Sequence, residues 1–261
     1  MTDREDPVGP FPRARLGTVD YMRVASRRSD VHGLVELDVT EAQRRIAEHE
    51  VETGERLSFT AFLVHCLAAA LEAHPDLNAY RDWRGRLVTF GDVDVNVIVE
   101  QEVDGRRIGV PHVLRAANRR SLRSLHDEIR ATQRSGSGPS RWAGVFFRLP
   151  GVLRRLVWRL PQWFPRRWKR LAGTVAVTSV GMFGSGGGWA ISPTNYTVQL
   201  TVGGIDAKPR LVDGELRNRD MLDLTVTVDH DVVDGAAATR FAGRLRALLE
   251  AASGLEAPDD S

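Results

Sequence analysis

The residue types best suited to acid–base chemistry lie in one segment of this sequence, Asp229-His-Asp-Val-Val-Asp-Gly235. His230 comes directly after a β-branched run that predicts a strand, so rigid backbone would hold its imidazole. A neutral imidazole near pH 7 can take a proton from a thiol or a hydroxyl. Asp234 would lie where the chain turns into a helix, and Gly235 would permit a tight approach. The pattern indicates a general base with a supporting carboxylate.

Spacing alone leaves other interpretations of this segment open. One histidine with aspartates nearby is more often a capped turn than a catalytic group. A metal site made of His230, Asp231 and Asp234 is a weaker reading, because ligands at i and i+4 need a helix at both positions and this histidine follows a strand. We therefore expect no metal here.

The rest of the chain supplies the elements that would position these residues. Apolar alternation and β-branched runs predict strands at 32–39, 86–90, 94–100, 107–113, 174–180, 196–203 and 222–228. Helical periodicity predicts helices at 41–52, 57–74, 121–134 and 236–252. The first of these helices would be capped by Thr40, with Gln43 closing a capping box. Together they predict an α/β (α+β) fold, with a mixed sheet flanked by helices in a single domain.

Composition is that of a globular protein. The 261 residues are 42% hydrophobic, which supports a substantial core, and we expect tails at 1–15 and 253–261 around a main domain at 16–252. The N-terminus lacks an apolar signal region and no apolar run could span a bilayer, so we expect a cytoplasmic location, with peripheral membrane contact as an alternative. Cys66 is the one cysteine and is expected to be a buried structural thiol.

A segment from about 139 to 171 stands apart in charge. Residues 141–170 hold nine Arg or Lys, no Asp or Glu, and four of the six tryptophans. A helix over 152–160 would place Val152, Leu153, Leu156, Val157 and Leu160 on one face and Arg154, Arg155 and Arg159 on another. Such an element suits a membrane interface, a lipid-like acyl chain or a neighbouring subunit. Nucleic acid is disfavoured, because leucine and valine are interleaved with the aromatic residues.

Five segments, in order along the chain, resemble the catalytic domains of 2-oxo acid dehydrogenase acyltransferases, which share their fold with chloramphenicol acetyltransferase. His230-x-x-x-Asp-Gly235 resembles the active-site signature of that family. A strand and loop of the family carry the pattern Gly-Thr-x-x-x-Ser/Thr-Asn-x-Gly-x-x-Gly. The segment here that resembles it is Gly173-Thr-Val-Ala-Val-Thr-Ser-Val-Gly-Met-Phe-Gly184. The segment 57–79 resembles its first long helix and following turn, and 94–99 with 109–111 resemble its substrate-channel strands.

The resemblance implies transfer of an acyl group between a coenzyme A thioester and a thiol such as dihydrolipoamide. It implies His230 as general base, Thr178 as the hydroxyl that stabilises the oxyanion, and Asp234 as support for the histidine loop; Ser179 and Gly181 would bind coenzyme A. Because the family forms trimers with active sites between subunits, the resemblance also implies a homotrimer or a higher multiple of three.

The sequence departs from the family pattern at two positions. Asp231 stands where the family usually carries Arg or Lys, and an acid close to the base would raise the pKa of the histidine. Ser179 stands where Asn is common. The chain also has no lipoyl-bearing segment, so we expect the acyl group to come from acyl-coenzyme A or from a separate lipoyl carrier. The alternative from another class is a non-catalytic assembly or membrane-associated scaffold protein of the same fold.

Overall fold

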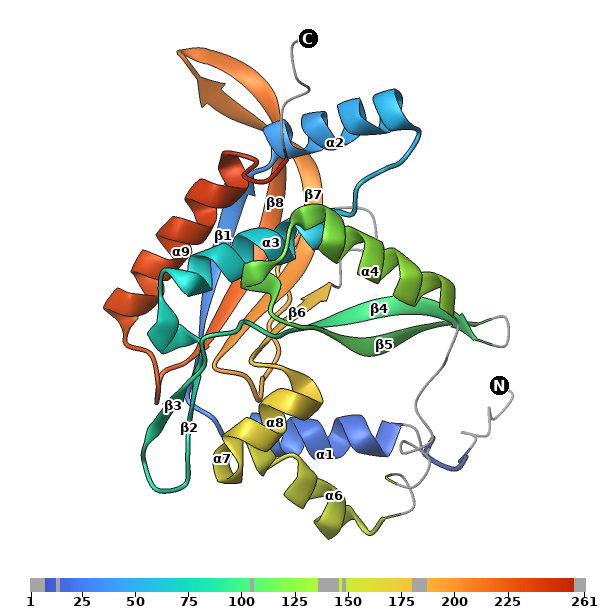
Figure 1. Ribbon diagram of the computed structural model, residues 1–261, viewed down its shortest axis with the longest axis vertical. Coiled ribbons are helices and arrows are strands. Elements are labelled where there is room, and N and C mark those ends of the chain that lie inside the picture. The colour runs from blue at the N-terminus through green and yellow to red at the C-terminus, as the bar shows by residue number, and fades with distance from the viewer. Residues whose placement is uncertain are drawn as a thin grey trace, which may run out of the picture.

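A six-stranded mixed sheet forms the centre of the computed structural model, which describes residues 8–12, 15–103, 106–135, 146, 149–179 and 187–255 (Figure 1). The strand order is β1-β8-β7-β6-β4-β5; β6 runs parallel to both of its neighbours and the other pairs are antiparallel. These strands are β1 (Asp30–Asp38), β4 (Val95–Val103), β5 (Arg106–Leu114), β6 (Val175–Ser179), β7 (Val198–Val212) and β8 (Glu215–Asp229). A separate hairpin pairs β2 (Ala79–Arg81) with β3 (Leu87–Thr89).

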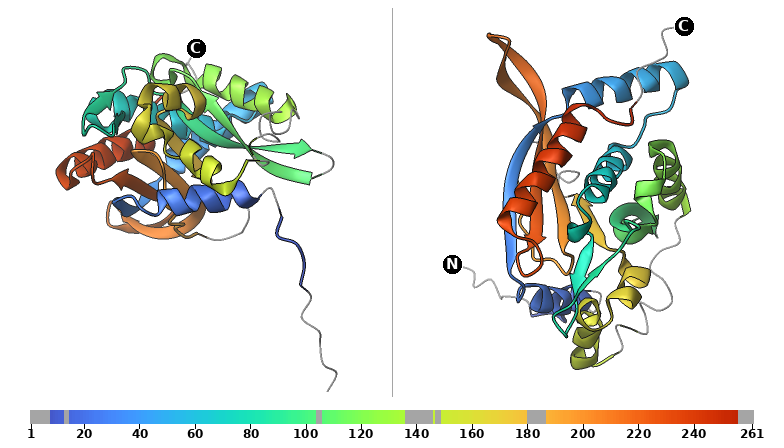
Figure 2. Two further views of the ribbon diagram at one scale, coloured as in Figure 1. Left: turned by 90° about the horizontal axis from the view of Figure 1, so that it is seen from below. Right: turned by 60° about the vertical axis from the view of Figure 1, so that its left-hand side comes forward.

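One face of the sheet is apolar because side chains alternate along each strand. Val97, Val177, Leu200 and Val226 point to this face and are buried. Four helices cover it (Figure 2), namely α2 (Thr40–Thr53), α3 (Phe59–Glu72), α4 (Leu122–Ser135) and α9 (Gly235–Glu250). Most residues of α3 are buried, since this helix packs on the sheet and on both α4 and α9.

The opposite face of the sheet is polar and largely buried. Asn96, Thr178 and Thr201 lie on neighbouring strands of this face, which continues to Thr225 on β8. Residues 187–195 lie against it, where the Gly188 N–H donates to Asp223 Oδ2 at 2.6 Å and Gln199 Nε2 donates to Ser192 Oγ at 3.1 Å. A buried polar face needs partners for its groups, so its composition indicates a binding surface more than a stabilising core.

A helical layer lies at one end of the sheet (Figure 1). It is formed by α1 (Arg15–Ala25), α6 (Gly151–Val157), α7 (Leu160–Trp163) and α8 (Pro165–Ala172). Short 3₁₀ helices at Pro75–Leu77 and Ala117–Arg119 complete the elements. None of the helices among the described residues is long and apolar enough to cross a lipid bilayer.

The predicted amphipathic helix over 152–160 was wrong in its length and in its faces. α6 ends at Val157, Val152 and Leu153 are exposed, and Arg154 is buried. The reason is Asp20 on α1, which accepts a hydrogen bond from Arg154 Nε at 2.7 Å and supplies the counter-charge that a buried guanidinium needs. The periodicity of the segment from about 139 to 171, which we call the insertion, does not signal this partner.

Thr40 does not cap α2, so the predicted capping box was also wrong. Val39 occupies the N-cap position without a side-chain bond. Thr40 Oγ1 instead accepts the Asp220 N–H of β8 at 2.8 Å, because the pairing of β1 with β8 extends to this point. β7 and β8 are longer than predicted, since they continue beyond the sheet as a hairpin around a turn at Asp213–Gly214 (Figure 1).

Candidate active site

His230 directly follows β8, on backbone that is held from both sides. Its N–H donates to the Ser29 carbonyl at 2.9 Å, and the Asp229 N–H donates to the Thr197 carbonyl at 3.0 Å. The His230 side chain is exposed, and no described residue forms a hydrogen bond with its imidazole. The backbone of His230 is therefore held in place while its imidazole is free to react. This arrangement suits a general base whose reaction partner comes from outside the described residues.

Asp229 anchors the histidine loop from inside the protein. Its buried carboxylate forms an ion pair with Arg28 and accepts the Asp231 N–H at 3.2 Å. Its carbonyl accepts the N–H groups of Val232 and Val233, both at 3.0 Å. Sequence reasoning missed this anchor. Arg28 lies just before β1, and β1 pairs with β8, which brings Arg28 next to Asp229. The sequence alone does not show which strands pair, so this contact could not be predicted from it.

Asp234 is the N-cap of α9. Its Oδ1 accepts the Ala237 N–H at 2.7 Å, which fixes the far end of the loop. The Asp231 carboxylate is directed to Arg81, with 3.8 Å between Oδ2 and Nη1, and both side chains are about half exposed. The two acids that flank the loop therefore have structural contacts of their own.

Thr178 lies in a cavity of about 500 Å³ on the polar face of the sheet. Trp158 of the insertion forms an edge-to-face pair with Tyr21 of α1 at 5.1 Å and another with Trp168 at 6.2 Å, measured between ring centroids. The insertion therefore builds one wall of this cavity. Its apolar lining residues are Met22, Ile98, Pro111, Val113, Val157, Leu171, Ala172, Ala176, Val177 and Pro193 together with these rings and Tyr196.

Asn96, Trp158 and Trp168, which line the Thr178 cavity, each have a buried polar atom without a partner among the described residues. Asn96 Nδ2 donates to Tyr196 Oη at 2.7 Å, but Asn96 Oδ1 has no donor. The indole N–H of Trp158 has no acceptor. Burial raises the pKa of the Tyr196 phenol, which therefore stays neutral and donates to the Ala172 carbonyl at 2.9 Å. Buried unpaired groups are costly unless a ligand satisfies them.

Ser179 points away from Thr178, because consecutive residues of β6 face opposite sides of the sheet. It lines a smaller cavity of about 170 Å³ beneath α3 and α4, with Phe59 and Leu63. The structure does not bring Ser179 and Thr178 into one cavity, and the role of Ser179 in binding coenzyme A stays a prediction. Gly181 lies outside the described residues.

Thr178 and His230 do not meet within one chain. Thr178 pairs with Thr201 on β7, and Thr201 pairs with Thr225 on β8. His230 lies five residues beyond Thr225, which places the two Cα atoms roughly 19 Å apart from strand rise and spacing. Within one chain, the open imidazole of His230 and the Thr178 hydroxyl in its cavity are therefore separate.

Two further groups bear on cofactors and reactivity. Cys66 is buried as predicted, and burial raises the pKa of its thiol to about 12, which is inconsistent with a nucleophile. Among the described residues, only Glu55, His126 and Asp127 gather three metal-capable atoms. His126 Nδ1 accepts the Ser58 N–H at 2.9 Å, so its Nε2 carries the proton and donates to Glu55 at 3.1 Å. That geometry fits a structural hydrogen bond.

Comparisons with known proteins agree with the fold and the order of these motifs. A sequence model of the family "2-oxoacid dehydrogenases acyltransferase (catalytic domain)" matches residues 10–138 and 171–256. The lipoamide acyltransferase component of the branched-chain alpha-keto acid dehydrogenase complex from Pseudomonas putida is 28% identical over 249 residues, which cover 92% of this chain and 52% of that protein. The chain spans about half the length of the curated relatives it matches.

Solved structures confirm the predicted fold. A probable dihydrolipoamide acetyltransferase from Listeria monocytogenes superposes with a TM-score of 0.73 at 21% identity over 98% of both chains. The dihydrolipoamide acetyltransferase of Azotobacter vinelandii gives 0.71 at 22% identity over 96% of this chain and 95% of that one. A chloramphenicol acetyltransferase gives 0.53 at 13% identity over 94% and 99%. Since the family model matches most of the sequence, this chain belongs to the 2-oxoacid dehydrogenase acyltransferase family through its catalytic domain.

Proposed function

We propose that this protein transfers an acyl group between a coenzyme A thioester and an acceptor thiol of the dihydrolipoamide type. The observation that carries the proposal is the pair of half-sites: His230 is exposed on rigid backbone, and Thr178 lies in a cavity with unsatisfied polar atoms. His230 offers a general base and Thr178 offers a hydrogen-bond donor for an oxyanion.

The role of each residue follows from its chemistry. His230 removes the proton of the attacking thiol, whose sulfur adds to the thioester carbonyl. The Thr178 hydroxyl donates to the oxyanion of the tetrahedral intermediate, a bond that can stabilise the transition state by about 3 kcal/mol. The intermediate then expels the other thiolate, which takes the proton back from the imidazolium. Asp234 holds the loop through its cap of α9 and moves no proton.

The Azotobacter vinelandii enzyme supports these assignments. It was studied for the roles of a serine, a histidine and an asparagine in its catalytic mechanism. In that protein the histidine follows the serine by 52 positions and precedes the asparagine by four, the same spacing that Thr178, His230 and Asp234 have here. A hydroxyl residue is retained at the first position, and a carboxylate replaces the amide at the third.

The proposed active unit is a homotrimer or a higher multiple of three. A separation of roughly 19 Å within one chain is too large for a base and an oxyanion donor that act on one thioester, by strand-spacing geometry. Apposition of His230 from one subunit with the Thr178 cavity of the next would complete the site. The acyl group itself would then enter the apolar cavity, which favours hydrophobic acyl chains over acetyl.

Release of free thiol from a panel of acyl-coenzyme A thioesters, with and without dihydrolipoamide, tests the proposal. Turnover that needs dihydrolipoamide and disappears in His230→Ala is the expected result. His49→Ala, which changes a histidine on α2 far from the loop, serves as the matched control and should retain activity. Equal turnover by the intact protein and His230→Ala would refute the assignment of the base.

A further inference from the structure

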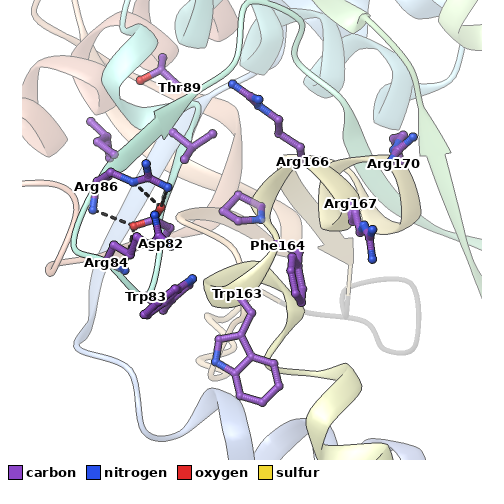
Figure 3. Close-up of a pocket in the computed structure, with 13 residues that line it drawn as sticks. Asp82, Trp83, Arg84, Arg86, Thr89, Trp163, Phe164, Arg166, Arg167 and Arg170 are labelled. Atoms are coloured by element: carbon purple, nitrogen blue, oxygen red, sulfur yellow. Dashed lines mark hydrogen bonds and ion pairs between the residues drawn. The ribbon is translucent and has the colours of Figure 1, made fainter.

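A further cavity, of about 970 Å³, lies between the β2–β3 hairpin and the α7–α8 part of the insertion (Figure 3). The hairpin contributes Trp83, Arg84 and Arg86, while the insertion contributes Arg166 and other residues of its last two helices. We refer to this space as the arginine cavity. The full lining is Asp82, Trp83, Arg84, Arg86, Leu87, Val88, Thr89, Trp163, Phe164, Pro165, Arg166, Arg167 and Arg170.

Positive charge dominates the arginine cavity. Asp82 is its only acidic lining residue, and Arg86 pairs with it at 2.7 Å and holds the pKa of its carboxyl below the usual value. The ionised Asp82 is therefore committed to Arg86. No described carboxylate lies within ion-pair distance of the other four arginines, Arg84, Arg166, Arg167 and Arg170. Four like charges around one space repel one another, and a bound polyanion would relieve that repulsion.

Aromatic rings line the same space. Arg84 stacks over Trp83 with its Cζ 4.7 Å from the ring centroid, and Arg167 lies 5.2 Å from that of Phe164. Figure 3 shows Trp163 beside Phe164 and across from Trp83. Trp83 and Phe164 are 64% and 48% exposed, which leaves ring surface free for a ligand to cover. Guanidinium groups match phosphate oxygens in pairs, and indoles offer flat apolar surfaces.

The walls of the cavity are fixed relative to one another. The Trp83 N–H donates to the Gln162 carbonyl at 2.8 Å and ties the hairpin to α7. Arg115 directly follows β5 and donates to the carbonyls of Lys169 and Arg170, at 2.8 and 2.5 Å, so it anchors the end of α8 beside the sheet. A preorganised basic surface loses little freedom when it binds an anion.

The arginine cavity is distinct from the cavity at Thr178. No residue lines both, although α8 contributes to each: Arg166, Arg167 and Arg170 face one, and Trp168 and Leu171 face the other. The α7–α8 wall falls mainly within 139–170, the segment that the family model does not match. The arginine cavity is thus a feature added to the acyltransferase domain by its insertion.

We propose that the arginine cavity binds a phosphorylated ligand that also carries a planar ring, of the nucleoside diphosphate class. The arginines would hold the phosphates and the tryptophans would stack on the base. A phosphorylated lipid headgroup shares the phosphate chemistry but has no ring to stack. A single concave site of this size suits one small molecule better than an extended nucleic-acid strand.

Titration with ADP, with inorganic pyrophosphate and with phosphatidylglycerol vesicles, each followed by tryptophan fluorescence and calorimetry on the intact protein, tests the site. We expect saturable, submillimolar binding of ADP with quenching, and weaker binding of pyrophosphate. The double variant Arg166→Ala/Arg170→Ala should weaken ADP binding by at least about tenfold, because it removes two charge-assisted contacts. Stronger binding to vesicles than to ADP, with the same loss in the double variant, would assign the phosphate site to a lipid headgroup.

A matched control separates a built site from general surface charge. Arg155 and Arg159 line a different cavity, beside α1, so Arg155→Ala/Arg159→Ala removes the same charge elsewhere on the insertion. ADP affinity should stay within about twofold in that variant and should not change when coenzyme A is saturating. An equal loss in both double variants, competition by coenzyme A, or no saturable binding of any probe would overturn the proposal. None of these measurements depends on acyl transfer, so they are independent of the proposed activity.

Discussion

Arg154 of the insertion and Asp20 of α1 form a buried ion pair, with side chains 10% and 3% exposed, that joins two parts of the chain 134 residues apart. Arg154 also donates to the Leu149 carbonyl at 2.6 Å. The pair therefore fixes both α6 and the chain that enters it. Since the insertion forms a wall of the Thr178 cavity, this contact positions part of the candidate active site.

Removal of one partner of this pair should be more harmful than removal of both. Asp20→Asn leaves a buried guanidinium without its counter-charge, and we expect a loss of about 3 kcal/mol in the free energy of unfolding. The double variant Asp20→Asn/Arg154→Met should recover part of that loss. Urea denaturation measures both values. Glu215→Gln, which breaks an exposed pair with Arg217, should change stability by about 0.5 kcal/mol or less, and an equal effect there would contradict the argument.

Mixed trimers should recover activity that neither parent variant has. His230→Ala and Thr178→Ala each destroy one half-site, so each homotrimer should be inactive or nearly so. After the two are unfolded together and refolded at equal amounts, about one quarter of the interfaces should pair an intact His230 with an intact Thr178. Thiol release should return to about that fraction of the original activity. No recovery, despite trimers of mixed composition by mass spectrometry, would place both residues in the same subunit's site.

Leu171 should govern acyl-chain preference without affecting the fold. It is 65% exposed and lines the Thr178 cavity. A charge there would be desolvated by an entering alkyl chain, so Leu171→Asp should raise the KM for long acyl thioesters by about tenfold and leave acetyl transfer nearly unchanged. Leu153→Asp is the control, since Leu153 is 46% exposed on the same insertion but lines neither cavity. Equal effects of the two variants would mean that acyl chains bind elsewhere.

The sequence was most informative where structure is local. The β8 strand, His230, Asp234 and α9 are consecutive, so the order of strand, loop and helix could be predicted from local residues, although β8 begins earlier than predicted. Strand alternation also separates Thr178 from Ser179, although only the structure shows that the two residues line different cavities.

Contacts between distant segments could not be predicted from one sequence. Arg28 and Asp229 are 201 residues apart, and Trp158 meets Tyr21 only because α1 and the insertion lie at the same end of the sheet. The periodicity of the insertion predicted that its arginines face solvent. Arg154 is buried instead, because it pairs with Asp20 of α1. A periodic sequence pattern reflects one element at a time, whereas burial of a charge depends on its partner.

Glu41 should make stability depend on acid pH. Hydrogen bonds from Arg44 and then Arg45 lower the pKa of its carboxyl to about 2 from 4.5. A carboxylate with a depressed folded pKa contributes stability that is present above pH 4.5 and is lost as the pH falls towards 2. Glu41→Gln should therefore be less stable than the parent at pH 7, and the difference should shrink through that window. Because the pair is exposed, high salt should reduce the effect; a pH-independent difference would exclude this origin.

Gly203 should tolerate no side chain, in contrast to Gly243. A Cβ at Gly203 would lie 1.6 Å from the Gly188 carbonyl oxygen, where residues 187–195 cross the β-bulge of β7. Gly203→Ala must push that segment off the polar face, so we expect a large loss of stability, of about 3 kcal/mol or more, by overpacking and loss of the Gly188–Asp223 bond.

At Gly243, inside α9, a Cβ meets nothing within 4 Å, and Gly243→Ala should raise stability by about 0.5–1 kcal/mol through helix propensity. Thermal and urea unfolding of the two variants should therefore shift in opposite directions. A neutral Gly203→Ala would show that the segment at Gly188 does not depend on close contact with β7.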